Sequence, residues 1–222
     1  MKLVIVTVGF DEKLPLRGVL KVGLDVSDVV MLVYSKTGGE FEVKKVERAV
    51  EVLKEIIRST GAGVVEVEVS GTSFYDDVAV VLRSLRGQKA DEVVAVLAGG
   101  MRLVIFEVLF ALLTLYRLGR FQRVRSKVLL MREDGLYGVA LPLESFYITI
   151  PRNGLAVMRI IHSHGEVKRS RLVETASREA GLSESAVYKI IKELEKRGLV
   201  VVDSDVVKLT ELGRSIYLGA GG

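Results

Sequence analysis

The stretch AVLAGGMRLVIFEVLFALL, Ala95–Leu113, decides how the first part of the chain folds. It begins as the end of an apolar, β-branched run, turns at Gly99 and Gly100, and continues with helical composition. A strand that enters a helix through a Gly-Gly turn places backbone N–H groups and the positive end of the helix at the carboxyl end of the strand. Arg102 adds a cation in the first turn, so this stretch predicts a binding site for an anion. A tight turn that only needs the φ freedom of glycine would have the same sequence.

Apolar runs and amphipathic segments alternate through the first 120 residues. Such alternation indicates right-handed βαβ units and a parallel sheet covered by helices on both faces. The segment Glu133-Asp134-Gly135 separates two further apolar runs and predicts an antiparallel hairpin at the sheet edge. The expected fold class is therefore α/β, with a doubly wound, mostly parallel sheet. We expect strands at 2–8, 29–34, 64–69, 91–98, 128–132 and 136–141, and helices at 12–22, 40–59, 74–85 and 101–118.

The pattern changes at Asn153. Helices are expected at 155–162 and 168–180, and Ser183 is a good N-cap for a third helix with apolar residues at i, i+3, i+4 and i+7. The short turn between the last two helices is typical of a helix-turn-helix, and a small hairpin is expected at 199–209. Three helices followed by a hairpin predict a winged helix-turn-helix. We therefore divide the chain into an α/β domain (1–142), a connector (143–152) and a winged-helix domain (153–222).

Composition limits the classes of function. The 222 residues include no cysteine, which excludes disulfides, thiolate metal sites and cysteine nucleophiles. The N-terminus has no secretory pattern, and the most apolar segment, 103–118, is short and carries Glu107. We therefore expect a cytoplasmic protein that does not span a membrane. The net charge is +4, and residues 152–222 hold 12 Lys and Arg against 9 Asp and Glu. This excess suggests a polyanionic partner, although a solvated basic surface would have the same composition.

The candidate ligand site follows from the expected strand order 3-2-1-4. Ligands of such sheets bind outside the carboxyl ends of the strands where the order reverses, here between the first and fourth strands. The first of these ends in TVGFDE (7–12) and the fourth in AGGMR (98–102), and the loops after the second and third strands add hydroxyl groups. No GxGxxG or Gly-Lys-Ser/Thr motif follows a strand, which argues against dinucleotide binding and against a P-loop ATPase. The candidate ligand-binding residues are Thr7, Gly9, Phe10, Asp11, Ser35, Thr37, Ser70, Gly99, Gly100, Met101 and Arg102.

The third helix of the winged-helix domain is the candidate DNA-reading element. Its first turns carry short polar side chains that suit base edges, and its lysines suit the phosphate backbone. A solvated helix face or a protein-docking element would carry similar residues. We expect no metal site, because His162 and His164 flank a helix end without other metal ligands nearby. The candidate DNA-binding residues are Ser183, Ser185, Tyr188, Lys189 and Lys192.

TVGFDE after the first strand, LAGGMR after the fourth, and a C-terminal winged helix together resemble the archaeal CRISPR-associated transcription regulators of the Csa type. These proteins join a CARF domain (CRISPR-associated Rossmann fold) to a winged helix-turn-helix. The resemblance covers nearly the whole chain and implies a Rossmann-like sensor domain. It also implies a homodimer whose two sensor domains share a pocket for a cyclic oligoadenylate, most simply cyclic tetraadenylate. On this resemblance the two motifs fall on Thr7 to Asp11 and on Gly99 to Arg102.

The resulting prediction is a transcriptional regulator that binds cyclic oligoadenylate across a homodimer and double-stranded DNA through its winged helix. It needs no cofactor and no catalytic residue. The alternative is an enzyme, either a ring nuclease or an RNA-cleaving enzyme that uses the same crevice. The expected sensor domain contains no histidine for proton transfer, so we do not predict ring cleavage.

Overall fold

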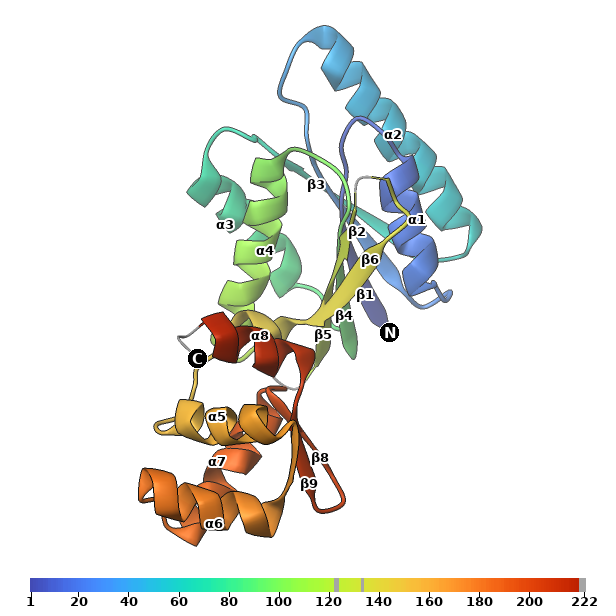
Figure 1. The fold of residues 1–222 in the computed structure, drawn as a ribbon. Helices are drawn as coiled ribbons and strands as arrows, with labels where there is room; N and C mark the ends of the chain where they lie inside the picture. Colours follow the sequence, from blue (N-terminus) through green and yellow to red (C-terminus); the bar gives the residue numbers. More distant parts are fainter. Residues whose placement is uncertain (122–123, 133, 220–222) are drawn as a thin grey trace. The chain divides into compact units, whose positions relative to one another are not determined.

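The computed structural model describes residues 1–121, 124–132 and 134–219. The chain forms two compact units, Met1–Phe146 and Tyr147–Gly222 (Figure 1). The segment 143–152, expected as a connector, is shared between them. Its first four residues form a short 3₁₀ helix, η1 (Leu143–Phe146), in the first unit.

A sheet forms the centre of the first unit. Within the described residues it has six strands in the order β3-β2-β1-β4-β5-β6. The strands from β1 to β5 pair in parallel, and β6 pairs antiparallel with β5, with Val128 opposite Leu141. The α/β prediction with an antiparallel edge hairpin is therefore confirmed. The strands are β1 (Lys2–Thr7), β2 (Val29–Ser35), β3 (Gly63–Val69), β4 (Glu92–Leu97), β5 (Arg125–Met131) and β6 (Gly138–Pro142).

Helices cover both faces of this sheet (Figure 1). One apolar core lies between the sheet and helices α1 (Lys13–Val22) and α2 (Glu40–Ser59). The other lies between the sheet and helices α3 (Phe74–Arg86) and α4 (Arg102–Arg117). Because the central strands are buried on both faces, their sequences are continuous apolar runs rather than alternating ones.

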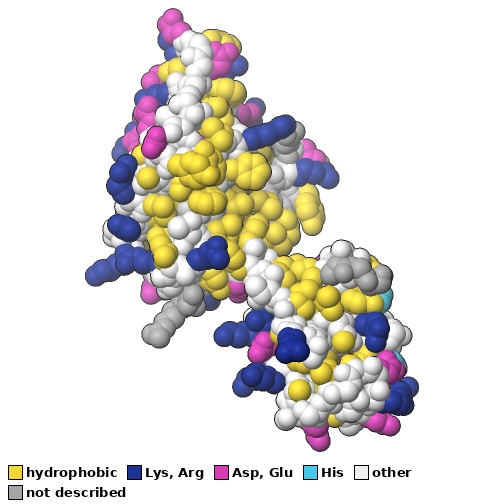
Figure 2. Space-filling view, turned by 90° about the vertical axis from the view of Figure 1, so that its left-hand side faces the viewer, with side chains coloured by type: hydrophobic (Ala, Val, Ile, Leu, Met, Phe, Trp, Pro, Cys, Tyr) yellow, Lys and Arg dark blue, Asp and Glu magenta, His cyan; other side chains and the backbone are white. Residues whose placement is uncertain are grey.

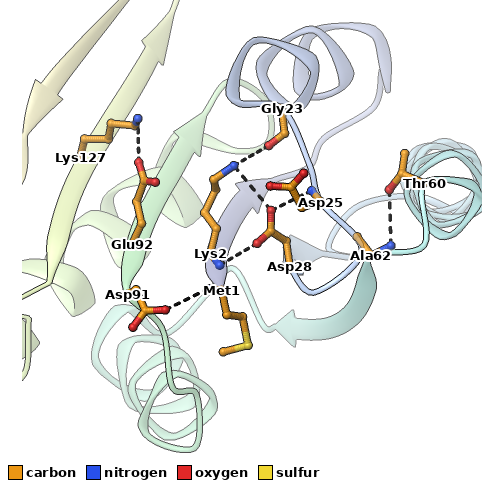
Figure 3. Close-up of polar contacts among 10 residues, drawn as sticks. All are labelled: Met1, Lys2, Gly23, Asp25, Asp28, Thr60, Ala62, Asp91, Glu92 and Lys127. Atoms are coloured by element: carbon orange, nitrogen blue, oxygen red, sulfur yellow. Dashed lines mark hydrogen bonds and ion pairs between the residues drawn. The ribbon is translucent and has the colours of Figure 1, made fainter.

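The amino end of the sheet is closed by a polar network around Asp28 (Figure 3). This buried carboxylate accepts hydrogen bonds from the backbone N–H groups of Lys2 at 2.7 Å and Asp25 at 2.9 Å. The Lys2 ammonium lies 3.5 Å from it and also donates to the Gly23 carbonyl. Burial alone would raise the pKa of Asp28, but these hydrogen bonds and the Lys2 charge hold it below its usual value.

The second unit contains helices α5 (Gly154–His164), α6 (Arg169–Ala180) and α7 (Glu184–Lys196) and, within the described residues, a three-stranded sheet in the order β7-β9-β8. The predicted helix-turn-helix and the hairpin of β8 (Val200–Asp203) and β9 (Val206–Leu209) are present. Two elements were not predicted. They are β7 (Glu166–Lys168) and α8 (Glu211–Gly219).

Several predicted boundaries need correction. Strand β5 begins at Arg125 rather than at residue 128, and α6 begins at Arg169 because the residues before it pair with β9. Of the three residues in the predicted edge turn, the structure describes Asp134 and Gly135, and Glu133 lies outside the described residues. Residues 220–222 of the predicted winged-helix domain lie outside them as well. Among the residues that are described, no helix is both long and apolar enough to cross a membrane.

The face of the first unit that carries α3 and α4 has a broad apolar surface (Figure 2). Phe106 and Phe110 on α4 are 61% and 46% exposed, and Tyr75 on α3 is 77% exposed. The rings of Phe74 and Phe110 pack edge to face, with centroids 5.6 Å apart. Large aromatic side chains gathered on one surface in this way commonly mark a contact with another molecule.

Candidate functional site

Two glycine-bearing loops meet at the carboxyl end of the sheet. A Cβ added to Gly9, in the β1–α1 loop, would lie 2.5 Å from the backbone nitrogen of Gly100 in the β4–α4 loop. A Cβ on Gly99 would lie 2.9 Å from Cγ of Pro15, and Gly100 has a positive φ of 102°. The glycines are therefore required for the close packing of the two loops. This packing also brings both loops to one place on the sheet edge.

A pocket of about 550 Å³ opens at this point, a volume typical of small-molecule sites. Among the described residues, seven of the eleven predicted ligand-binding residues line it. The pocket thus joins the two loops that the strand order predicts to lie together. The seven are Gly9, Phe10, Asp11, Ser35, Gly99, Gly100 and Met101.

The pocket combines apolar walls with positive charge. Phe10 is 52% exposed and offers an aromatic face beside the glycine loops. Lys13 and Arg17 on α1 supply two cations. Asp11 is the acidic residue of the lining, and its carboxylate accepts a hydrogen bond at 2.7 Å from the backbone N–H of Lys13, the first residue of α1. The arrangement suits a ligand with anionic groups and a flat apolar part.

Sequence reasoning missed six lining residues. Three of them, Lys13, Leu14 and Arg17, have the sequence spacing of residues on one face of a helix. A helix was expected at 12–22, directly after the first glycine loop, so this spacing could have predicted them. Val8 and Ala98 lie inside the two quoted motifs, each directly before a glycine. No signal in the sequence indicated Val46, which comes from α2 and reaches the pocket only through the packing of α2 on the sheet.

Four predicted ligand residues lie outside the pocket lining. Thr7 is fully buried, and its Oγ1 has no hydrogen-bond partner among the described residues. Thr37 and Ser70 belong to a hydrogen-bond network with Ser35. Ser35 Oγ lies 2.8 Å from Thr37 Oγ1 and donates to the Ser70 carbonyl at 3.0 Å. Arg102 is the first residue of α4 and is exposed. Their roles as ligand contacts stay predictions.

Beneath the β3–α3 loop lies a pair of buried acidic side chains. Asp77 accepts hydrogen bonds from the backbone N–H groups of Ser70 and Gly71 and from the Ser70 hydroxyl, all within 2.9 Å. Glu107 on α4 is fully buried, and neither of its oxygens finds a donor among the described residues. Burial, together with the negative charge of Asp77, raises the pKa of Glu107 to about 7. When Glu107 is protonated, its hydroxyl can donate to the Asp77 carboxylate, which removes the repulsion between two negative charges and gives the buried Glu107 a hydrogen-bond partner.

The predicted DNA-reading helix is α7. Its apolar residues Val187, Ile190, Ile191 and Leu194 pack into the core of the second unit. All five predicted DNA-binding residues are exposed to solvent, four of them on α7 and Ser183 at its N-cap. Ser183 Oγ accepts a hydrogen bond from the Ala186 N–H at 3.3 Å, so the N-cap prediction is confirmed. Neither Lys189 nor Lys192 forms an ion pair with a described residue.

A groove of about 290 Å³ lies between α7 and the hairpin. It is lined in part by Tyr188 and Lys192, and by Arg169, which was not predicted. The Arg169 guanidinium donates to the carbonyl of Ser204 at 3.0 Å, and its backbone N–H donates to that of Asp205 at 2.8 Å. Arg169 therefore ties the start of α6 to the tip of the hairpin and sets the wing beside the recognition helix.

The histidines lie where the sequence placed them, at the end of α5. His164 Nδ1 lies 2.9 Å from the Ile160 carbonyl oxygen. The rings of His162 and Tyr217 pack together with their centroids 4.9 Å apart. Among the described residues, no group of three or more His, Cys, Asp or Glu side chains is placed to hold a metal ion.

Family models match both parts of the chain. Residues 2–127 match the Csa3 CRISPR-associated Rossmann-like domain, and residues 152–209 match the penicillinase repressor family. The chain therefore joins a CARF-type Rossmann-like domain to a repressor-type winged helix. No curated protein matches the chain.

Among solved structures, the chain is similar to Can2 from Sulfobacillus thermosulfidooxidans in complex with cyclic tetra-adenylate. The TM-score is 0.41 and the sequence identity 11%, over 99% of this chain and 64% of the Can2 chain. This chain thus spans less than two thirds of the Can2 length. The match over residues 2–127 does cover more than half of the chain. The protein belongs to the family defined by the Csa3 CRISPR-associated Rossmann-like domain.

Proposed function

We propose that this protein is a ligand-gated transcription regulator, like the archaeal regulators that its sequence resembles. The pocket of the first unit binds a cyclic oligoadenylate, and the winged helix binds double-stranded DNA. One observation carries the proposal: the two glycine loops of a CARF-type domain form one pocket with apolar and cationic walls. The same chain carries a helix-turn-helix whose exposed Lys189 and Lys192 form no ion pair with a described residue.

The chemistry of the pocket supports a nucleotide ligand. The Gly99–Met101 loop and the following start of α4 offer backbone N–H groups, which suit phosphate oxygens. Phe10 and Met101 offer surfaces on which an adenine ring packs. The proposal includes no metal ion and no other cofactor.

The proposed assembly is a homodimer. Two-fold symmetry is the commonest arrangement of soluble oligomers, and helix-turn-helix dimers read two DNA half-sites. The exposed Phe106 and Phe110 of α4 supply an apolar surface for a second copy, and α4 starts at the pocket loop. A symmetric ring such as cyclic tetraadenylate then presents the same half to each protomer. Replacing Phe106 with Arg is expected to give a monomer in light scattering, and a variant that stays dimeric would exclude this surface.

Titration calorimetry with cyclic tetraadenylate tests the ligand. The result expected is saturable binding at one ring per two chains, with weaker binding of linear tetraadenylate and none of NAD. Absence of binding by the ring would overturn the proposed ligand.

We propose further that the protein acts as a sensor and not as an enzyme. After prolonged incubation with the protein, the ring is expected to elute intact from an ion-exchange column. Linear products that form in proportion to the protein concentration would favour the ring-nuclease alternative.

A further inference from the structure

The positive charge of the pocket comes from one face of α1. Lys13 and Arg17 both line the pocket and lie four residues apart, so their side chains are neighbours on the helix surface. Arg102, the cation expected from the Gly-Gly turn, is not part of the lining. An anion in the pocket therefore meets two adjacent cations, both from the helix that follows the β1–α1 loop.

The two cations are held differently. Nη1 of Arg17 donates a hydrogen bond of 3.0 Å to the carbonyl of Asp134 in the β5–β6 turn. Gly135 follows with a positive φ of 68° and packs directly against the guanidinium, where a side chain would collide with it. The Lys13 ammonium has no partner among the described residues. Arg17 is thus oriented in advance by a neighbouring turn, while Lys13 is free to move toward a ligand.

This arrangement fits two linked anionic groups. Side chains at i and i+4 start about 5–6 Å apart, and their flexible stems adjust to neighbouring phosphates. The arginine presents a planar fork with several donors, whereas the lysine is a compact charge that adapts to position. The aromatic face of Phe10 lies in the same pocket and suits a base attached to such a backbone.

We infer that Lys13 and Arg17 form a two-cation subsite that binds adjacent phosphodiester groups of the ligand. The subsite deepens the proposed function and rests on it for the identity of the ligand. The α1 pair, rather than Arg102, then provides the main positive charge for binding.

The experiment compares Lys13→Ala, Arg17→Ala and Arg17→Lys with Lys21→Ala. Lys21 is an exposed residue of the same helix outside the pocket lining, so its loss makes the same change in net charge. Arg102→Ala serves as a second comparison. Each full-length variant is titrated in a calorimeter with cyclic tetraadenylate, linear tetraadenylate and pyrophosphate, after circular dichroism has verified its fold.

Alanine at Lys13 or Arg17 is expected to weaken binding of each probe that the wild type binds by about tenfold or more, since a charge-assisted hydrogen bond is lost. Arg17→Lys should keep part of the affinity, and Lys21→Ala should bind within about twofold of wild type. Alanine variants that match Lys21→Ala, while the wild type binds the ring, would overturn the subsite and leave the proposed function standing.

The experiment also distinguishes the case in which the subsite is correct and the proposed ligand is wrong. A wild type that binds linear tetraadenylate or pyrophosphate through Lys13 and Arg17, but not the ring, would support the subsite and overturn the proposed ligand. A wild type that binds none of the three probes would overturn both.

Discussion

Replacing Glu107 with glutamine is expected to remove a pH-dependent loss of stability from the first unit. Glu107 is fully buried beside Asp77, and its pKa is raised from the ordinary 4.5 to about 7. A raised carboxyl pKa means that the folded state favours the protonated form. The wild type therefore has its full stability below about pH 4.5 and loses part of it as the pH rises from there through about 7, the pKa of Glu107 in the folded state. Glutamine has the same shape, stays neutral and can donate to Asp77.

The magnitude follows from the pKa. One pKa unit corresponds to about 1.4 kcal/mol, so full ionisation of Glu107 costs the folded state about 3 kcal/mol. Between about pH 5 and pH 8, the free energy of unfolding of the wild type should fall by about 2.5 kcal/mol more than that of Glu107→Gln. At pH 8 the variant should be the more stable protein.

Urea unfolding followed by circular dichroism at the two pH values measures this difference. Unfolding of the second unit, which the substitution does not touch, is the internal reference. Glu92→Gln is the matched control. A hydrogen bond from Lys127 lowers the pKa of Glu92, so its ionisation changes little in this pH window. An equal pH dependence in wild type and Glu107→Gln would show that Glu107 is not protonated in the fold.

Other substitutions test the glycine loops, the amino edge and the DNA surface. Gly9→Ala is expected to cost about 1–3 kcal/mol in thermal unfolding because its methyl group meets Gly100, whereas Gly87→Ala, which meets nothing, should cost far less. Equal costs would refute this packing. Asp28→Asn should cost about 2 kcal/mol in urea unfolding at neutral pH. This difference should shrink in acid as Asp28 is protonated, and a constant difference would contradict its lowered pKa. Lys189→Ala should weaken DNA binding and reduce the salt slope by about one. An unchanged slope would remove Lys189 from the interface.

The central strands were predictable because burial on both faces leaves a simple signature. Val4, Ile5 and Val94 are fully buried, and each lies in an uninterrupted apolar run. The predicted start of strand β5 was wrong for a physical reason. Its first residues, Arg125 to Lys127, are polar and join the sheet only by pairing with β4, which no local pattern indicates.

Helix α8 depends on tertiary contacts in the same way. It is nine residues long, and Gly213 within it approaches the Leu199 carbonyl too closely for any side chain. A glycine inside a short helix lowers helix propensity, so only packing explains this helix. The Thr210 hydroxyl, which accepts from the Gly213 N–H at 3.0 Å, was the local signal of its start.

The candidate site was predictable in part. The strand order brings the Gly9 and Gly99 loops together, and these loops do line the pocket. The α1 cations were missed because their contribution depends on which face of the helix turns to the pocket. The hydroxyls of Thr37 and Ser70 illustrate the reverse case. Both follow strands as expected, but they hydrogen-bond to neighbouring protein groups outside the pocket lining, Thr37 to Ser35 and to the Ser70 carbonyl, and Ser70 to Asp77 on α3.

The effect of the ring on DNA binding tests the central claim most directly. Fluorescence anisotropy of a DNA duplex, selected by the protein from a random pool, is measured with and without saturating cyclic tetraadenylate. A ligand-gated regulator should show a change in DNA affinity of about fivefold or more, and DNA should change the affinity for the ring by the same factor. A ring that binds the pocket while the DNA affinity stays the same would contradict the claim.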